Sequence, residues 1–568
     1  MKILIRDYLA SLKERDELDA ILPDLLSELG FTVFSRPQRG TQQRGVDIAA
    51  VGIDQDGERK VFLFSVKQGD LTRQDWDGNP QAMRSSLDEI LDAYIPNRIP
   101  KRYKDLKIVI CLAFGGDVKE QVRELLTGYT KKYTNDQISF DEWNGDKISE
   151  LILSGILRED ILPKKLRSNF QKSVAMLDEP EVSFKHFSIL LNDLFQLAQK
   201  SQKARLQVAR QLNICLWILY VWARDIDNLE GPYKASELAL LYAWELQKPF
   251  IDKKTKNAVS MTRALTQLID LHVNILNEFL EKKIIPFVDI PHGLSLSMNT
   301  QHSLDINLSL FDVLGRIALA GLWLHWIRER TGNQNSESIQ KVIMMFAGSG
   351  FKMIRNNPTL MLPIADHQRA DITLFLQLWL VSGLDTSELI FWLNEMAGRF
   401  NFTINTRNHY ISSSSDYREL ADHPVDRSDE YFQDATAGST ILPLITAWLH
   451  ALGQADAVDG LIKVAREKLE HCTFQLWRPN VNSEEKMFIG HDLHGKALTE
   501  LPLTDGGELL INVIAEAVEK DEIFEQLTPI KTGYWIFFLI ACHHYRLPVP
   551  PHFWINSLLP PEENEQET

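Results

Sequence analysis

The stretch Gly45–Gly69, GVDIAAVGIDQDGERKVFLFSVKQG, decides how the N-terminal part of the chain folds. Residues 46–53 are small and apolar, and they end at an Asp-Gln-Asp-Gly turn at 54–57. A second apolar run, 60–67, follows at once. We therefore predict a β-hairpin whose second strand ends in a lysine, beside the strand that carries Asp47.

Side chains alternate across a strand, so Ser65 and Lys67 share one face of the second strand while Val66 lies on the other. Asp47 and Lys67 lie in or at the end of apolar runs, where removing a charge from water is costly. Taken singly, each has the plainer interpretation of a solvated strand end. Taken together, they favour a site that binds a metal ion or a phosphate group between them.

The segments around the hairpin predict a complete α/β domain. We expect a helix over 5–29 interrupted by Pro23, a strand over 31–35, the hairpin, a loop over 68–80, a helix over 81–94, a strand over 107–114, a helix over 117–133, a strand over 137–143 and a helix over 146–157. A strand followed by a crossover helix and another strand implies a mixed or parallel sheet covered on both faces.

Gly45-Val46-Asp47 followed by Ser65-Val66-Lys67 resembles the PD-(D/E)XK nuclease superfamily, and within it the Mrr-type restriction endonucleases and the archaeal junction resolvases. That superfamily has a helix, three strands, a helix and a further strand, with an Asp on the second strand and a D/E/Q-x-K tripeptide on the third. The resemblance covers residues 1–160 and implies a restriction-endonuclease-like mixed sheet flanked by helices. The chain departs from the family pattern at Ser65, where the family has a carboxylate or a glutamine.

The resemblance implies a metal-dependent endonuclease that hydrolyses phosphodiester bonds of nucleic acid, with DNA as the expected substrate. Its cofactor would be Mg²⁺, or Mn²⁺ in its place, because hard oxygen ligands suit a hard cation. Asp47 would be the main metal ligand, with the backbone carbonyl of Val66 alongside. Lys67 would orient the attacking water and stabilise the charge that grows on the phosphate. Ser65 offers only a neutral oxygen, so metal affinity should fall.

Two other places offer the missing negative charge. Members of the resembling family often carry an acidic residue on the first helix, and this position falls on Asp19, with Glu17 as the alternative. The loop after the second hairpin strand offers Asp70, Asp75 and Asp77. If none of these serves, the fold would be a degenerate nuclease kept as a scaffold that binds nucleic acid or protein without cutting.

The loop 36–44, RPQRGTQQR, holds three arginines just before Asp47. Arginine forks suit phosphate oxygens, and glycine allows backbone N–H groups to approach a ligand closely. The expected phosphate contacts are Arg39, Gln43, Arg44 and Gln68. The plainer alternative is a flexible polar loop. Trp76, in the loop after the hairpin, is expected either to stack on a base or to form a domain or subunit contact.

Composition limits the broad class of the protein. A length of 568 residues predicts two to four domains. The 61 basic and 77 acidic residues give a net charge of −16, so nucleic acid would have to meet a local basic patch. Four cysteines without a CxxC pair favour reduced thiols in the cytoplasm. The charged N-terminus and the short apolar runs predict neither a secretory signal nor a membrane span.

The remainder of the chain is predicted to be a linker over 161–183, a mainly α-helical region over 184–555 with two halves split near 399–439, and a disordered acidic tail over 556–568. Without a recognisable second catalytic motif, the helical region is expected to regulate or assemble. By analogy, bacterial restriction and antiphage effectors join a nuclease to a large sensor domain. The expected partners are nucleic acid, further copies of the chain and an activating protein.

Two histidine-containing segments in the helical region hold residue types that bind metals. They are His491-Asp492-Leu493-His494 and Cys542-His543-His544. Their spacing fits no zinc template, and structural histidines with satisfied hydrogen bonds are commoner. The sequence alone therefore favours a structural role for both segments.

Overall fold

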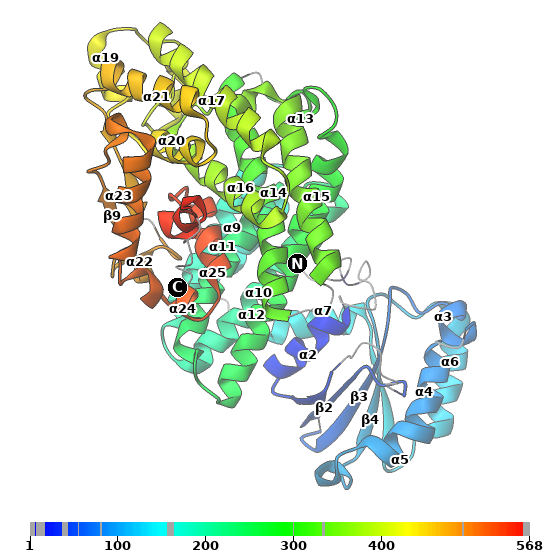
Figure 1. Cartoon of the computed structure of the whole chain (residues 1–568). Helices are drawn as coiled ribbons and strands as arrows, with labels where there is room; N and C mark the ends of the chain where they lie inside the picture. The colour runs from blue at the N-terminus through cyan, green and yellow to red at the C-terminus, as the bar shows by residue number, and fades with distance from the viewer. Residues whose placement is uncertain are drawn as a thin grey trace. The chain divides into compact units, whose positions relative to one another are not determined.

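The computed structural model describes most of the 568-residue chain. The described residues are 6, 9, 18–36, 44–54, 56–79, 82–155, 164–298, 300, 302–331, 336–490 and 494–560. The chain divides into two compact units (Figure 1). The first contains Met1–Ala235 and Lys253–Ala264, and the second contains Ser236–Asp252 and Leu265–Thr568.

The first unit contains a five-stranded sheet in the order β1-β2-β3-β4-β5. Its strands are β1 (Thr32–Ser35), β2 (Ile48–Ile53), β3 (Arg59–Lys67), β4 (Ile108–Phe114) and β5 (Ile138–Trp143). The first three form an antiparallel meander, β4 runs parallel to β3, and β5 runs parallel to β4. The predicted mixed sheet near the N-terminus is thus confirmed.

The hairpin between β2 and β3 forms for the reason given by its sequence. The N–H of Gly57 donates to the carbonyl of Asp54 at 2.9 Å, and Gly57 has a positive φ of 82° that a glycine adopts without strain. Residues 60–66 of β3 and all of β4 are buried, so helices must cover both faces of the sheet.

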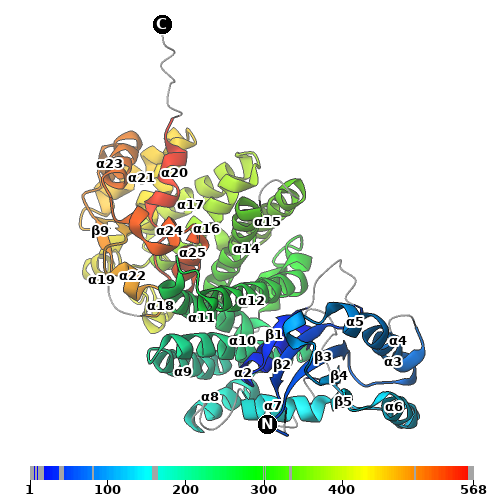
Figure 2. The same ribbon diagram turned by 90° about the horizontal axis from the view of Figure 1, so that it is seen from below.

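The two faces of the five-stranded sheet are covered by different helices (Figure 2). The face with Val61 and Leu63 packs against α3 (Arg73–Asp77), α4 (Met83–Glu89) and α6 (Glu120–Tyr133). α2 (Asp19–Glu28) and α7 (Gly145–Gly155) contact each other and pack against β1, β2 and β5 on the other face. Between α4 and β4 the chain forms a π-helical turn (Ile90–Tyr94) and α5 (Ile95–Arg98).

Two segments predicted as loop or linker contain helices. The loop predicted over 68–80 contains α3, which begins at a capping box between Thr72 and Asp75. The linker predicted over 161–183 contains α8 (Lys164–Ala175) and the start of α9 (Pro180–Ala198). The first unit continues with α10 (Gln202–Asp225), so its described helices extend beyond the predicted domain end at residue 160.

The large helical remainder predicted from the sequence is also observed. Its main helices are α11 (Glu230–Gln247), α12 (Lys256–Phe279), α14 (Ser303–Thr331), α15 (Ser336–Asn356), α16 (Arg369–Ser382), α17 (Ser387–Thr406), α20 (Ile441–Ala451), α21 (Ala455–Lys468), α23 (Gly507–Glu519) and α25 (Trp535–His544). In the second unit, α14 packs against α15, α16 and α25. The region 399–439, where a split was predicted, begins inside α17 and then contains two short helices, α18 (Tyr417–Asp422) and α19 (Asp429–Ala435).

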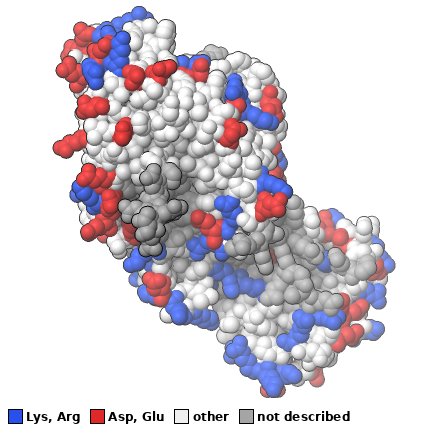
Figure 3. Space-filling view, in the orientation of Figure 1, with Lys and Arg blue, Asp and Glu red and all other residues white. Residues whose placement is uncertain are grey.

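At the C-terminal end, a 3₁₀ turn spans Ile555–Leu558 and overlaps the start of the tail predicted over 556–568. Residues 561–568 of that tail lie outside the described residues. Helix α14 is long and apolar enough to cross a membrane, but 78% of its most apolar window is buried inside the protein. Packing thus accounts for its apolar side chains, as for the core helix of a soluble protein. On the face shown in Figure 3, basic and acidic side chains are interspersed over the helical unit.

Candidate active site

Asp47, Ser65 and Lys67 lie at one end of the sheet in the first unit. Asp47 directly precedes β2, and Lys67 is the last residue of β3. Ile48 pairs with Phe64, so Asp47 is level with Ser65. Strand alternation puts Ser65 and Lys67 on the face of the sheet covered by α3, α4 and α6. This is the carboxyl end of the parallel pair β3 and β4, the edge where α/β sheets commonly bind ligands.

Backbone contacts fix the position of Asp47. Its N–H donates to the carbonyl of Phe64 at 2.9 Å, and its carboxylate accepts the N–H of Val66 at 2.8 Å. The N–H and C=O of one strand residue point the same way, so the carbonyl of Val66 faces the Asp47 side of β3. The preceding Gly45 has a φ of 75°, and a Cβ there would overlap the backbone carbonyl of Ser86 on α4. Gly45 therefore lets the Asp47 segment pack closely against α4.

Ser65 is buried in this arrangement, with 1% of its surface exposed. Among the residues that the structure describes, its hydroxyl oxygen has no hydrogen-bond partner. A buried hydroxyl without a partner is costly. The position that holds a carboxylate or glutamine in the resembling family thus holds a small polar group whose hydrogen-bonding capacity is unused within the described chain.

The three aspartates after β3 are held by other groups. Asp70 accepts the N–H of Asp117 at 2.8 Å and pairs with Lys119 at 2.6 Å, and these two partners lower its pKa below the ordinary value. Asp75 bonds the N–H and hydroxyl of Thr72 as part of the α3 capping box, and Asp77 pairs with Arg73 at 3.0 Å. Their local bonds give each of them a structural role, which does not favour them as a substitute for the missing carboxylate.

The structure describes some of the other predicted site residues and leaves the rest outside the described residues. Asp19 lies half-buried in the first turn of α2, and Glu17 lies outside the described residues. Arg44 is exposed with a positive φ of 53°, and Gln68 is exposed directly after β3. The two remaining predicted phosphate contacts, Arg39 and Gln43, lie outside the described residues.

The expectation that Trp76 is exposed and stacks on a base or contacts another domain is wrong. Only 1% of its surface is exposed, and its ring packs edge-on against Tyr129 of α6, with ring centroids 5.7 Å apart. Trp76 belongs to the hydrophobic core between the sheet and its covering helices. It lies on α3, which the loop prediction did not include.

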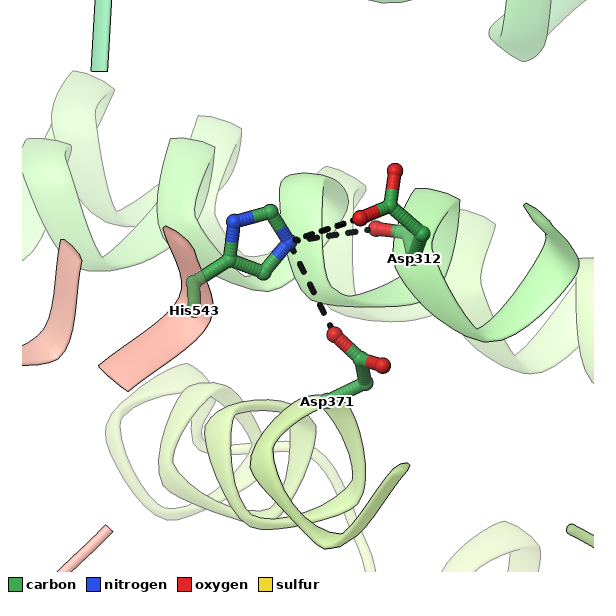
Figure 4. A group of neighbouring side chains, drawn as sticks. All are labelled: Asp312, Asp371 and His543. Carbon is green, nitrogen blue, oxygen red and sulfur yellow. Dashed lines mark hydrogen bonds and ion pairs between the residues drawn. The ribbon is translucent and has the colours of Figure 1, made fainter. Parts of the chain in front are cut away.

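A second polar cluster lies in the core of the second unit (Figure 4). It joins Asp312 of α14, Asp371 of α16 and His543 of α25, whose ligand-type atoms all lie within 4.8 Å of one another. The Nε2 atom of His543 lies 3.5 Å from Asp312 Oδ1 and 3.6 Å from Asp371 Oδ1. The other ring nitrogen, Nδ1, lies 2.8 Å from a carboxylate oxygen of Glu237 on α11.

Charged neighbours surround this cluster. Arg546 donates to Asp371 at 2.7 Å and also to Asp312, and Arg316 pairs with the other oxygen of Asp312 at 2.5 Å. Burial disfavours the charged form of Glu237. The two histidines that bond it, His543 and His544, outweigh burial and hold its pKa well below the ordinary value. Among the residues of this cluster, the sequence analysis considered only His543 and His544. It missed Asp312 and Asp371, each of which is a lone aspartate within an apolar helical run.

Comparison of the chain with protein-family models, with curated proteins and with solved structures finds no match. The function of the chain must therefore be argued from the two clusters themselves.

Proposed function

We propose that the first unit is a metal-dependent nuclease domain of the PD-(D/E)XK kind and that it hydrolyses phosphodiester bonds of DNA. One observation carries the proposal. Asp47 and the Ser65-Val66-Lys67 tripeptide come together at the carboxyl end of β3, joined by the hydrogen bond from the Val66 N–H to the Asp47 carboxylate. The succession of a helix, three strands, intervening helices and a further strand along the chain also supports the proposal.

The residues present partly fit a Mg²⁺ or Mn²⁺ ion. Asp47 offers one carboxylate and Val66 a carbonyl that faces it, and both are hard oxygen ligands. Ser65 offers a hydroxyl whose hydrogen-bonding capacity is unused within the described chain. Such an ion supplies charge stabilisation to the scissile phosphate and lowers the pKa of a bound water. With a single firmly placed carboxylate, we expect weak metal binding and a requirement for millimolar metal.

Each side chain has a defined task in this proposal. Asp47 holds the ion, and its bond to the Val66 N–H keeps the carboxylate fixed relative to the tripeptide. Lys67, half-buried at the end of β3, orients the attacking water and stabilises the negative charge that grows on the phosphate. Arg44 and Gln68 are exposed beside these residues in the sequence and bind flanking phosphates.

The test is cleavage of plasmid DNA, single-stranded DNA and RNA by the full chain with Mg²⁺ or Mn²⁺. Wild type should cut DNA, and Asp47→Ala and Lys67→Ala should each reduce the rate by at least about 100-fold, as expected for residues that act on the transition state. Asp136→Ala and Lys131→Ala, two exposed residues of the same unit, are matched controls that should cut like wild type. Cleavage that survives both site substitutions would refute the assignment.

The burial of Ser65 favours a second candidate, a nuclease fold that binds nucleic acid or a protein without cutting. Here wild type would retard DNA in a gel but leave it intact with every metal. Ser65→Glu then separates the cases, because a restored carboxylate should create metal-dependent cutting in a fold that lacks only that group. If Ser65→Glu also fails to cut, an activating partner protein becomes the next thing to seek.

We further propose that the chain acts in the cytoplasm as a homo-oligomer in defence against foreign nucleic acid, with the second unit as regulator. Nucleases that cut both strands commonly work in pairs, and paired active sites explain why an oligomer is useful. Light scattering coupled to size-exclusion chromatography, with and without DNA, tests this. A monomer under both conditions would rule out the oligomer.

A further inference from the structure

An open cavity of about 430 Å³ lies in the second unit. Its wall includes residues at the starts of α16 and α20, residues of strands β8 (Leu476–Arg478) and β9 (Lys496–Leu498), and residues that follow α25. Pockets that bind small ligands have volumes of about 300–1,000 Å³. The cavity therefore has the size needed to hold one small organic molecule.

We propose that this cavity binds a small organic molecule with one carboxylate and a flat apolar body. Arg369 of α16 bonds the carboxylate, and the aromatic and aliphatic side chains of the wall contact the body. All of these residues belong to the second unit, so the proposal does not depend on the nuclease assignment. Because the ligand contacts several separate segments, its binding stabilises the folded unit.

Arg369 is a largely buried cation with too few partners. Its side chain is 17% exposed, and its Nη1 donates to the backbone carbonyl of Asp366 at 3.1 Å and lies 3.5 Å from the Asp366 carboxylate. The Nε atom is buried without a hydrogen-bond partner among the residues that the structure describes. Burial lowers the pKa of Arg369 from its ordinary value, because the nearby Asp366 does not fully offset the loss of water. A carboxylate ligand supplies the partner that the guanidinium lacks.

Asp366 is a poor partner for Arg369 because it is already bonded to the start of α20. Its carboxylate accepts the N–H groups of Thr440 and Ile441 at 2.9 and 3.1 Å. It also accepts the hydroxyls of Thr440 and Ser439 at 2.5 and 3.2 Å. These bonds direct the negative charge of Asp366 to the positive end of a helix. The guanidinium thus retains a charge that a second carboxylate can bind.

The charge of the cavity wall selects a ligand with a single negative charge. Among the described residues that line the cavity, Arg369 alone is a lysine, arginine, aspartate or glutamate. His494 also lines it, but burial, helped by Lys486, lowers the pKa of this histidine below 6.5, so it is neutral at pH 7. Gln475 adds an amide that can donate to a carboxylate oxygen. A phosphate monoester carries nearly two charges, which one guanidinium matches less well.

The apolar part of the wall is held in place by bonds within the protein. Trp477 of β8 pairs with Ala497 of β9, so both side chains lie on one face of this ribbon. The indole N–H of Trp477 donates to the carbonyl of His494 at 3.0 Å. A Cβ at Gly495 would lie 2.1 Å from the same nitrogen, so glycine lets the chain approach the indole. The other large apolar or aromatic side chains of the wall are Leu476, Tyr545, Leu547 and Pro548. Such a wall suits a flat apolar body.

The experiment is isothermal titration calorimetry of the full chain with three carboxylates and their uncharged amides. The probes are phenylacetate, indole-3-acetate and 2-naphthylacetate, each compared with its amide. For the two larger acids we expect a Kd of about 0.1–1 mM, as is usual for ligands of this size. Affinity should rise with ring size as more apolar surface is buried. Each amide should bind at least about 10-fold more weakly, because it lacks the charge that Arg369 bonds.

Two variants locate the binding site. Arg369→Gln should abolish the preference for acid over amide, an effect that loss of a merely structural residue would not produce. Ala497→Trp, at an exposed position of β9, should fill the cavity and weaken the binding of every probe by at least about 10-fold. Arg399→Gln changes an exposed arginine of α17 and is the matched control that should bind as wild type does.

Four results would overturn the proposal. They are no binding of any probe to wild type up to about 10 mM, equal affinities for acids and amides, an unchanged acid preference in Arg369→Gln, and undiminished binding by Ala497→Trp. The comparison of acids with amides needs wild type alone, so it holds even if a substitution impairs folding. Asp47→Ala should bind the probes as wild type does, so the nuclease proposal can fail while this one holds.

Discussion

Gly45 occupies a position where two physical demands coincide. Its φ of 75° lies in the left-handed region, and a Cβ would overlap the Ser86 carbonyl. Left-handed backbone costs a side chain about 1–2 kcal/mol and overpacking costs a further 1–3 kcal/mol, so Gly45→Ala should destabilise the hairpin by about 2–5 kcal/mol. Hydrogen exchange of the β2 and β3 amides measures this directly.

Gly57 is the matched control for this prediction. Its φ of 82° is similar, but nothing lies within 4 Å of the Cβ that alanine would add. Gly57→Ala should therefore cost only the backbone term of about 1–2 kcal/mol. Equal losses of protection in the two variants would show that the contact between Gly45 and α4 is unimportant.

His552 makes stability depend on pH. It is stacked on Phe524 with ring centroids 4.2 Å apart, and burial, helped by Arg478 and opposed by Asp521, lowers its pKa to about 4. An unfolded chain protonates the same ring near its ordinary value of 6.5, so the unfolded state binds the extra proton first. The contribution of the neutral His552 to the free energy of unfolding is thus complete above pH 6.5, and it is lost as the pH drops from 6.5 toward 4.

The measurement is the melting temperature at pH 7.5 and at pH 5.0. The wild type should lose stability between these values, and His552→Gln should lose less because it removes the group that the acid must protonate. His302→Gln, at an exposed position, should retain the wild-type difference. An unchanged difference in His552→Gln would mean that other groups set the acid sensitivity.

Single residues show where sequence reasoning reached its limit. Asp47 and Lys67 could be found because a charge inside an apolar strand run is a local signal, and the structure brings their strands together. The burial of Trp76 depends on Tyr129, which lies on another helix, so nothing near Trp76 reveals it. Asp312, Asp371 and His543 meet only after three helices pack, and their spacing along the chain carries no motif.

At the scale of elements, α20 depends on a carboxylate from outside itself. The buried Asp366 accepts N–H bonds from Thr440 and Ile441 at 2.9 and 3.1 Å and a hydroxyl bond from Thr440 at 2.5 Å. Asp366→Asn presents an N–H₂ group to donors and removes charge from a helix N-terminus. We expect a loss of about 2–3 kcal/mol, seen as faster hydrogen exchange at the start of α20.

Asp416 provides the comparison, because it caps the exposed N-terminus of α18 with bonds to the N–H groups of Arg418 and Glu419. Asn is about as good a cap as Asp at an exposed site, so Asp416→Asn should cost less than about 0.5 kcal/mol. A comparable loss in both variants would contradict a special role for the buried carboxylate.

The elements that the sequence predicted well are those set by local pattern. The hairpin follows from its Asp-Gly turn and period-two side chains, and β4 from an unbroken apolar run. The short helix α3 was missed because its five residues carry no helical period, and its start depends on the Thr72 and Asp75 capping box. Helix α8 was missed because a segment with so many charged and polar side chains is as typical of a linker as of a surface helix.

For the whole molecule, the long apolar helix α14 makes a clear prediction. Most of its apolar surface is already buried by neighbouring helices, so it should have no tendency to enter detergent micelles. In Triton X-114 phase separation the native chain should stay in the aqueous phase. Recovery in the detergent phase would show that α14 meets lipid.

The division of the chain into two units has a consequence for its synthesis. Unit one is completed by Lys253–Ala264, which the ribosome makes only after Ser236–Asp252, a part of unit two. At about 5–20 residues per second, the first unit must wait roughly 1–6 s beyond residue 235 for its last piece, plus the time in the exit tunnel. During that interval the nascent chain holds an unfinished sheet-bearing unit, which gives chaperones a defined moment to act.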